Sequence, residues 1–260
     1  MILKDKNILI TGSSRGIGKA LASEIAKENV HLILCSRSIE ESEVQRLMVL
    51  GAKSVCHYSV DLTDMKAIDE LIEKLKTDDI HIDVLINNAG QLTGGLFEEQ
   101  PLDKIHTMLD INLHAVLHLT HKLLPSMIKK GEGKIINNAS VSGKMFFPCA
   151  STYAASKAAI VAFTESLKQE LRGTGVSTLL LITPGVKTEM YDDIANLYGT
   201  NLDTSDFTYI PANKWAQKII QAIKKDKDSL WPQGGNRFGV LLGHHFPNIF
   251  AKFIKSRFKR

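Results

Sequence analysis

The stretch that decides the fold is NILITGSSRGIG, residues 7–18. Its first half, NILIT, is a short apolar run typical of a buried strand. Its second half has glycine at positions 12, 16 and 18 and leads into residues 17–28, where Ile17, Leu21 and Ile25 share one helical face. A strand, a glycine-rich turn and a helix in this order predict a site for a dinucleotide, because the glycines let the backbone approach a pyrophosphate and the helix N-terminus offers free amide donors. A purely structural turn is the competing interpretation.

Outward from this stretch, short apolar runs alternate with helical patterns along most of the chain. Further strands are expected at residues 30–35, 54–60, 83–87, 134–138 and 177–183, and further helices at 64–76, 102–109, 113–129, 151–171 and 212–224. Nearly continuous apolar strands separated by helices indicate a parallel sheet that is covered on both faces. Right-handed crossovers then give a doubly wound α/β domain, a Rossmann fold, over residues 1–235, followed by a distinct tail at 236–260.

The composition agrees with one ordinary globular domain. The chain has 260 residues, of which 44% are hydrophobic and 23% charged, and this excludes a disordered or collagen-like protein. No apolar run approaches the ~20 residues that a membrane span needs, and the first residues lack the core of a signal peptide. The three cysteines are widely spaced, so they predict neither a disulfide framework nor a CxxC metal pair. We therefore expect a reducing, cytoplasmic location.

The end of the second expected strand bears on the choice between NAD and NADP. An acidic residue there would bind the ribose 2′-hydroxyl of NAD, but this chain has Ser36 and Arg37. Arg37 can pair with a 2′-phosphate, and Arg15 in the glycine-rich turn could supply a second cation. The sequence therefore predicts NADP(H). The competing interpretation is that both arginines are solvated surface residues.

A tyrosine and a lysine lie four residues apart in the expected helix 151–171. This spacing puts Tyr153 and Lys157 on one helix face. A nearby cation favours the phenolate and lowers the pKa of a tyrosine, so such a pair can donate a proton to a carbonyl oxygen or accept one from an alcohol. The hydroxyl of Ser140, at the end of the fifth strand, could hold the substrate oxygen. Alone, the pair could equally be a surface contact.

Taken together, these motifs resemble those of the short-chain dehydrogenase/reductase family, over about residues 5–230. The residues that carry the resemblance, in chain order, are Gly12–Gly18, Asp61-Leu62-Thr63, Asn87-Asn88-Ala89-Gly90, Asn112, Ser140, Tyr153 with Lys157, and Pro184-Gly185. The glycine spacing, G-x-x-x-G-x-G, also matches the spacing of that family.

The resemblance implies a role for each position. The catalytic set would be Asn112, Ser140, Tyr153 and Lys157. Tyr153 would be the general acid/base, Lys157 would lower its pKa, and Asn112 would break its helix locally and hold a water of a proton relay. The cofactor would be held by Gly12, Ser14, Arg15, Ile17, Gly18, Arg37, Asp61, Leu62, Asn88, Ala89, Gly90, Tyr153, Lys157, Pro184, Gly185, Val186 and Thr188. The resemblance also implies a homo-oligomer, a dimer or a tetramer.

Two further segments would shape a substrate site. Residues 145–148, Met-Phe-Phe-Pro, lie between Ser140 and Tyr153, where the resemblance places the substrate, and local packing is the alternative. Residues 186–210 correspond to the substrate-binding lid of the family. His114, His118 and His121 share one helix face, but they lack an adjacent further ligand, so we expect surface or interface histidines and no metal.

The positive charge of the chain is concentrated in the tail. The formal net charge is +4, but residues 236–260 hold six Lys or Arg and no acidic residue, which leaves the first 235 residues with 26 basic and 28 acidic side chains. Nucleic acid is therefore not expected as a partner. Phe246, Ile249, Phe250, Phe253, Ile254 and Phe258 follow helical spacing among basic residues. Peripheral membrane contact through residues 244–260 and packing on protein both fit this pattern.

The sequence thus predicts an NADP(H)-dependent oxidoreductase that reduces a ketone, an aldehyde or a 3-oxoacyl group to an alcohol, or catalyses the reverse. Its substrate would be a small, apolar carbonyl or alcohol. Two alternatives stay open, an NAD-preferring alcohol dehydrogenase and a non-catalytic dinucleotide sensor. A carboxylate at position 36 would favour the first, and loss of a catalytic residue would favour the second; the chain shows neither.

Overall fold

A computed structural model describes residues 1–260, except for the side-chain surroundings of residues 235 and 236. Its centre is a parallel sheet of seven strands in the order β3-β2-β1-β4-β5-β6-β9. The strands are β1 (Asn7–Thr11), β2 (His31–Ser36), β3 (Ser54–Ser59), β4 (Val84–Asn87), β5 (Gly133–Asn138), β6 (Val176–Leu181) and β9 (Ser229–Leu230). From the centre of the sheet, the chain order runs outward through β1, β2 and β3 on one side and through β4, β5 and β6 on the other. The doubly wound fold expected from the sequence is therefore confirmed.

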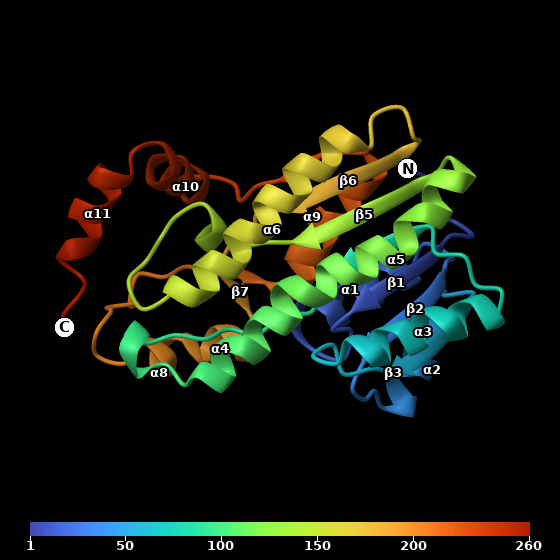
Figure 1. The fold of residues 1–260 in the computed structure, drawn as a ribbon, viewed down its shortest axis with the longest axis horizontal. Coiled ribbons are helices and arrows are strands. Elements are labelled where there is room, and N and C mark those ends of the chain that lie inside the picture. The colour runs from blue at the N-terminus through green and yellow to red at the C-terminus, as the bar shows by residue number, and fades with distance from the viewer.

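Helices cover both faces of the sheet (Figure 1). They are α1 (Gly16–Ala26), α2 (Glu41–Val49), α3 (Met65–Thr77), α4 (Leu102–Leu109), α5 (Ala115–Lys130), α6 (Ser151–Glu170) and α9 (Ala212–Lys224). Ile8 and Ile10 of β1 pack with α1 and α9, whereas Leu9 faces the layer of α3 and α5. Successive strand residues point to opposite faces, and this explains why apolar residues fill the strands almost without interruption.

Two parts of the domain were not predicted from the sequence. Helix α2 is short, and its surface is largely polar, so it shows little apolar periodicity. Strand β9 has only two residues and pairs with Leu180 and Leu181 at the edge of the sheet. Both elements take their structure from tertiary contacts, which local patterns do not reveal.

Residues 186–210 form a small substructure beyond the end of the sheet. It contains strands β7 (Val186–Lys187) and β8 (Ile210–Pro211), which pair in parallel, and helices α7 (Glu189–Asp192) and α8 (Ile194–Tyr198). We call this segment the lid. The paired strands at its two ends fix where it leaves and rejoins the domain.

The tail forms two helices, α10 (Gly235–His245) and α11 (Pro247–Lys255), at one end of the molecule (Figure 1). The helical spacing of apolar residues through Phe258 suggested that the helix continues to that residue, and this was wrong. Helix α11 begins at Pro247, which is favoured at the first position of a helix, and it ends at Lys255. Phe258 instead forms a β-bridge with Leu202 of the lid. The boundary predicted at residue 235 stays a prediction.

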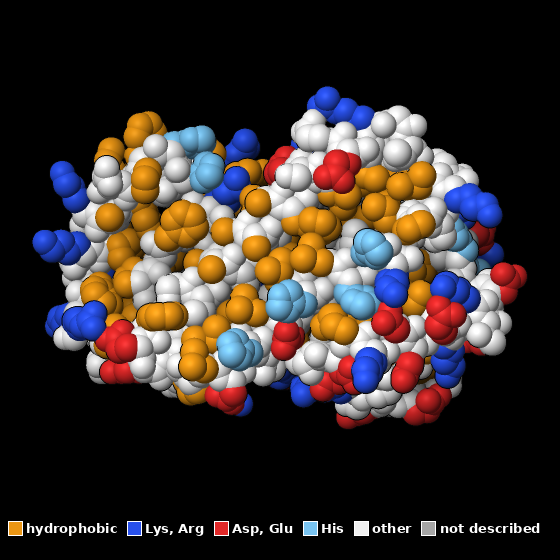
Figure 2. Space-filling view, in the orientation of Figure 1, with side chains coloured by type: hydrophobic (Ala, Val, Ile, Leu, Met, Phe, Trp, Pro, Cys, Tyr) orange, Lys and Arg blue, Asp and Glu red, His pale blue; other side chains and the backbone are white. Residues whose placement is uncertain are grey.

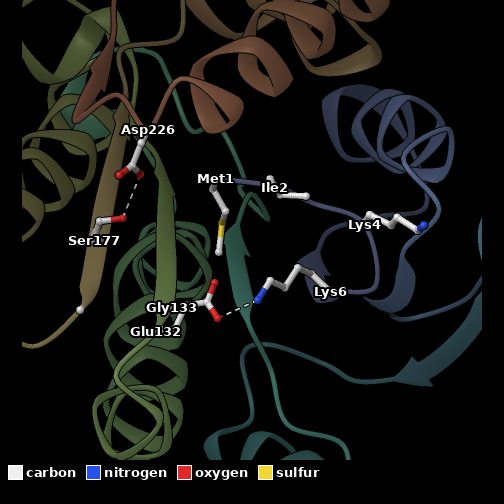
Figure 3. A pocket seen from close by; sticks show the side chains of 9 residues that line it. Met1, Ile2, Lys4, Lys6, Glu132, Gly133, Ser177 and Asp226 are labelled. Atoms are coloured by element: carbon white, nitrogen blue, oxygen red, sulfur yellow. Dashed lines mark hydrogen bonds and ion pairs between the residues drawn. The ribbon is translucent and has the colours of Figure 1, made fainter.

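A hollow of about 440 Å³ lies at the amino ends of β5 and β6 (Figure 3). Polar side chains line it, among them Lys6, paired with Glu132 at 2.7 Å, and Ser177, hydrogen-bonded to Asp226 at 3.3 Å. Ligands of doubly wound sheets bind at the carboxyl ends of the strands, so this hollow lies at the wrong edge for the expected chemistry. Among the described residues, no helix combines the length and the apolarity needed to cross a membrane.

Candidate active site

The glycine-rich turn lies at the carboxyl end of β1 and is packed too closely for side chains. Gly12 has a φ of +64°, and a Cβ there would lie 2.8 Å from the Cα of Ala89. A Cβ on Gly18 would lie 2.0 Å from the carbonyl oxygen of Gly12. Such distances are far below van der Waals contact, so only glycine fits at either position. The turn and the segment after β4 are thereby held against each other, as the sequence predicts for a cofactor site.

The N-terminus of α1 can receive an anion. In the described structure no side chain caps this helix, and the free amides of such an N-terminus can bind an anion. Arg15 lies at the cap position and pairs with Glu189 of α7 at 2.6 Å, with both side chains about two-thirds exposed. A Cβ on Gly16 would lie 3.3 Å from Cγ2 of Thr188. The turn therefore faces the start of the lid, and this arrangement fits the phosphates of a dinucleotide.

Polar residues follow β2 and β3 at the same edge. The Ser36 hydroxyl donates to the carbonyl oxygen of Ser38 at 3.0 Å, and Arg37 is exposed. The pKa of Asp61 is lowered, first by hydrogen bonds from Thr63 and further by the charge of Arg37. Arg37 and Asp61 thus lie near each other, as expected for the adenosine end of the cofactor. Of the other residues predicted here, Leu62 is buried, Ser14 is exposed and Ile17 is half-buried.

Asn138, at the end of β5, joins several parts of the site, and no role was predicted for it from the sequence. Its carbonyl oxygen accepts from Nζ of Lys157 at 2.8 Å, and its side-chain amide donates to Asn88 at 3.1 Å. Its Oδ1 accepts from the hydroxyl of Thr183 at 2.5 Å. The signal that could have revealed it is the pair of asparagines that ends this buried strand, where polar side chains need partners.

Asn112 is 1% exposed and interrupts the helix, as the family resemblance implies. It lies in a π-helical turn, Asp110–His114, between α4 and α5. Its side-chain amide donates to the carbonyl of Gln91 at 2.9 Å and to the hydroxyl of Ser156 at 3.1 Å, and its Oδ1 accepts from the amide of Gln91 at 2.8 Å. Such π-turns recur at functional sites. A Cβ on Gly90 would lie 3.3 Å from Oδ1 of Asn112 and 3.6 Å from Nζ of Lys157.

Tyr153 and Lys157 lie together on α6, next to Ser140. Nζ of Lys157 is 5.8 Å from the centroid of the Tyr153 ring, and Ser140 hydrogen-bonds the phenol. The lowering of the Tyr153 pKa by Lys157 stays a prediction. Burial raises the pKa of Tyr153 to about 12, although the Ser140 bond opposes it, and burial lowers the pKa of Lys157 to about 8. Desolvation disfavours the charged form of each group.

The segment after β6 closes the site from the lid side. A Cβ on Gly185 would lie 2.4 Å from the carbonyl oxygen of Thr208 and 2.7 Å from the ring of Tyr191. The Thr188 hydroxyl accepts from the amide of Tyr191 at 3.3 Å and caps α7. Pro184, Gly185, Val186 and Thr188 therefore lie where the lid leaves the domain, across from the glycine-rich turn.

Tyr198 of α8 lies near Tyr153, a position that was not predicted from the sequence. The residue is 5% exposed, and a Cβ on Gly94 would lie 2.6 Å from its ring. Burial raises the pKa of Tyr198, and the nearby Tyr153 raises it further. Phe147, of the apolar loop predicted to border the substrate, packs in the same cluster. The position of Tyr198 depends on how the lid folds back, which no local pattern reveals.

His114, in the π-helical turn, and His118, on α5, contact carboxylates of different elements. His114 pairs with Asp110 at 2.8 Å, and His118 with Asp69 of α3 at 2.9 Å. Among the described residues, no group of three or more His, Cys, Asp or Glu could hold a metal ion. The expected absence of a metal stays a prediction.

With this geometry in place, comparison with known proteins identifies the family. A family model described as short chain dehydrogenase matches residues 6–197. The chain belongs to the short-chain dehydrogenase family. Its sequence is 36% identical over 230 residues to an uncharacterized oxidoreductase of Staphylococcus saprophyticus, covering 87% of this chain and 93% of the relative. It is also 36% identical over 185 residues to the ketoacyl reductase HetN of Nostoc, covering 70% of this chain and 64% of that protein.

Solved structures of short-chain dehydrogenases share the fold. One from Streptomyces avermitilis superposes with a TM-score of 0.80 at 25% identity, covering 97% of this chain and 96% of that one. A single-residue variant of the actinorhodin polyketide ketoreductase with NADPH superposes with a TM-score of 0.77 at 25% identity, covering 86% and 94%. This short-chain dehydrogenase is therefore an oxidoreductase of a family that binds a nicotinamide dinucleotide and acts on small molecules.

Proposed function

We propose that the protein reduces a ketone, an aldehyde or a 3-oxoacyl group to an alcohol with NADPH, or catalyses the reverse, with Tyr153 as general acid/base. One observation carries the proposal. The Tyr153 phenol is hydrogen-bonded to Ser140, beside the buried ammonium of Lys157, at the edge of the sheet where the glycine-rich turn lies. A carbonyl oxygen that reaches Tyr153 would meet two hydroxyl groups and a nearby positive charge.

Each group has a part in the reduction. NADPH, when bound, supplies the hydride that adds to the carbonyl carbon. Tyr153 donates its proton to the carbonyl oxygen, so that an alcohol and NADP⁺ result. A phenol with a pKa of about 12 stays protonated at neutral pH, which suits a proton donor. Ser140 orients the oxygen, and the ammonium of Lys157 stabilises the phenolate that forms. Asn112, held by Gln91 and Ser156, would support the water through which Lys157 passes protons on.

The preference for NADPH rests on the residues after β2. Arg37 is exposed near Asp61 and has the planar, permanently charged group that suits a phosphate. Arg15 could join it after exchanging Glu189 for a phosphate. The NADPH in the structurally similar polyketide ketoreductase supports the same choice.

The substrate would be apolar around its carbonyl. Met145 and Phe147 of the loop after Ser140, with Tyr198 and Leu197 of the lid, form one apolar cluster beside the catalytic residues. Apolar lining with a few polar groups is typical of small-molecule sites. The similarity to the ketoacyl reductase HetN supports a 3-oxoacyl group as one candidate.

A homo-oligomer, a dimer or a tetramer, is a further part of this proposal. Hydrophobic and histidine side chains gather over α5 and α6 on the face drawn in Figure 2. Light scattering on the purified protein measures its mass, and a monomer at micromolar concentration would contradict this part.

Substitution of the phenol tests the mechanism. Tyr153→Phe should lower the turnover of NADPH oxidation, screened across carbonyl classes, by about 10²-fold or more, because the proton donor is lost. NADPH binding, measured by fluorescence titration, should change little. Tyr58→Phe is the matched control. Its phenol donates to Asp78 at the end of α3 and is not one of the residues of the proposed site. Turnover of Tyr153→Phe near that of the control would refute the mechanism, and failure of the wild type on every carbonyl class would favour a non-catalytic sensor.

Substitution of Arg37 tests the cofactor. Arg37→Ala should reduce the NADPH-over-NADH ratio of kcat/KM by about tenfold, as expected for loss of a charge-assisted contact. Arg172→Ala, at an exposed position after α6, is the control. Equal efficiency of the wild type with NADH, or an unchanged ratio in Arg37→Ala, would favour the NAD-preferring alternative.

A further inference from the structure

The tail helices have an inner face that is buried and an outer face that is not. Val240, Phe250 and Ile254 are 0%, 7% and 6% exposed and pack against the domain. On the outer face, five large apolar side chains are between 36% and 70% exposed: Phe238, Leu241, Phe246, Ile249 and Phe253. Packing on protein, one of the two interpretations of the sequence, therefore accounts for only three of these eight apolar side chains.

The outer face is also positively charged. Arg257 pairs with Asp206 and Arg260 with Glu98, both outside the tail. The remaining four basic side chains of residues 236–260 have no ion pair among the described residues: Arg237, Lys252, Lys255 and Lys259. Figure 2 shows hydrophobic side chains gathered over α10 and α11, with Lys and Arg at the outer edge of the molecule. An exposed apolar patch of this size marks an interaction surface, and the cations around it favour an anionic partner.

Charge decides which occupant fits this face. Two copies of the chain that met through this face would bring two sets of these unpaired cations into one interface without a carboxylate side chain of the tail to compensate them, and like charges would repel. A bilayer with anionic headgroups supplies both an apolar layer for the exposed rings and negative charge for the unpaired cations. Its interface accepts Phe and Ile side chains below the headgroups, and its surface potential attracts Lys and Arg.

We propose that α10 and α11 dock the protein on an anionic lipid bilayer through Phe246, Ile249 and Phe253, with Lys252 and Lys255 on the headgroups. The inner face of α11 links this surface to the substrate site. The Phe250 ring is 5.3 Å from that of Phe147, which is 5.4 Å from that of Phe207 in the lid. Docking would thus bring the lid close to lipid. This consequence rests on the proposed function: an apolar carbonyl dissolved in the membrane would then have a short route to the active site.

Sedimentation of the full-length protein with vesicles tests the docking. The probes are vesicles of phosphatidylcholine alone and vesicles with about 30 mol% phosphatidylglycerol. Binding should require the anionic lipid and should weaken when salt is raised from about 0.1 M to about 0.5 M, because the cations act through a screened potential. Lys252→Gln/Lys255→Gln should weaken binding by about 30-fold, since each basic side chain near such a surface contributes roughly fivefold. Phe246→Ser/Ile249→Ser/Phe253→Ser should weaken binding by at least as much, because it removes the apolar side chains that would enter the interface.

The controls keep the result interpretable. Lys214→Gln/Lys225→Gln, at exposed positions at the two ends of α9, and Val49→Ser, at an exposed position on α2, should bind like the wild type. All substituted side chains are exposed, so far-UV circular dichroism and Tm should be unchanged. Turnover of a water-soluble carbonyl should also be unchanged in every variant, and this separates failure of docking from failure of the proposed function. The proposal is overturned if the wild type ignores anionic vesicles, or if the apolar variant only converts an oligomer to a monomer.

Discussion

Two lysines lie buried near opposite ends of strand β5. Lys134, at the amino end of β5, is 0% exposed, and Lys157, beside the carboxyl end of the same strand, is 4% exposed. Lys134 pairs with the carboxylate of Asp226 at 2.6 Å and donates to Ser177 at 3.0 Å. Lys157 has no carboxylate partner among the described residues and donates to the carbonyl oxygen of Asn138.

The difference in partners distinguishes Lys134, whose charge is paired, from Lys157, whose charge we propose to take part in catalysis. A carboxylate compensates the desolvation of Lys134, and in return Lys134 holds the pKa of Asp226 below its usual value. A carbonyl dipole compensates Lys157 only in part, so the pKa of this lysine falls to about 8. The chain therefore keeps an under-compensated charge beside Tyr153, where a phenolate would use it, and a paired charge at the edge that we expect to have no chemistry.

The largest expected effect comes from removing the under-compensated charge. Lys157→Met keeps most of the side-chain volume and removes the ammonium that would stabilise the Tyr153 phenolate. Turnover at saturating NADPH should fall by about 10²-fold or more. Single-turnover hydride transfer measures this without product release. Lys168→Met, on the same helix in a half-exposed ion pair with Glu165, is the control, and equal rates for the two variants would contradict the role of Lys157.

The same substitution should stabilise the fold, because burying a charge with few partners costs free energy. The pKa of Lys157 falls from 10.5 to about 8 on folding. Below pH 8 the folded and unfolded chains both carry the proton, and the burial cost is complete. Between about pH 8 and 10.5 the folded chain loses the proton first, so wild-type stability rises with pH. Lys157→Met should thus be about 1–3 kcal/mol more stable than the wild type at pH 7.

Urea unfolding at several pH values measures this advantage. It should shrink as the pH rises from about 8 to 10.5, because the wild type alone gains stability there. An advantage that does not depend on pH would mean that packing of the methionine, and not removal of the charge, causes it.

Sequence reasoning predicted the reactive edge much better than the other edge. Tyr153 and Lys157 are four residues apart on one helix, and a helix brings such residues together whatever surrounds them. Lys134 and Asp226 are 92 residues apart and meet only because β5 enters the sheet beside the turn after α9. Asn138 and Tyr198 were missed for the same reason, since tertiary contacts give them their partners. The rise in the pKa of Tyr153 was not anticipated because its cause, burial, is a property of the folded site.

The smallest expected effect comes from making Lys134 resemble Lys157. Asp226→Asn replaces the carboxylate by an amide of the same shape, and asparagine tolerates the positive φ of 48° at this position. The buried ammonium then keeps only neutral acceptors, the amide oxygen and Ser177. The free energy of unfolding should fall by about 1–2 kcal/mol, less than for complete loss of the partner, because the amide can still accept from Lys134. Turnover should be unchanged, because the pair lies at the edge opposite Tyr153.

Asp228→Asn is the matched control for this prediction. Asp228 is 65% exposed and lies 3.8 Å from Lys168, so its removal should change stability by no more than about 0.5 kcal/mol. If Asp226→Asn were equally harmless, the carboxylate would not be what compensates the burial of Lys134, and the contrast between the two lysines would fail. If it lowered turnover at full stability, the amino edge would be coupled to the site, and the division between a structural and a reactive edge would have to be abandoned.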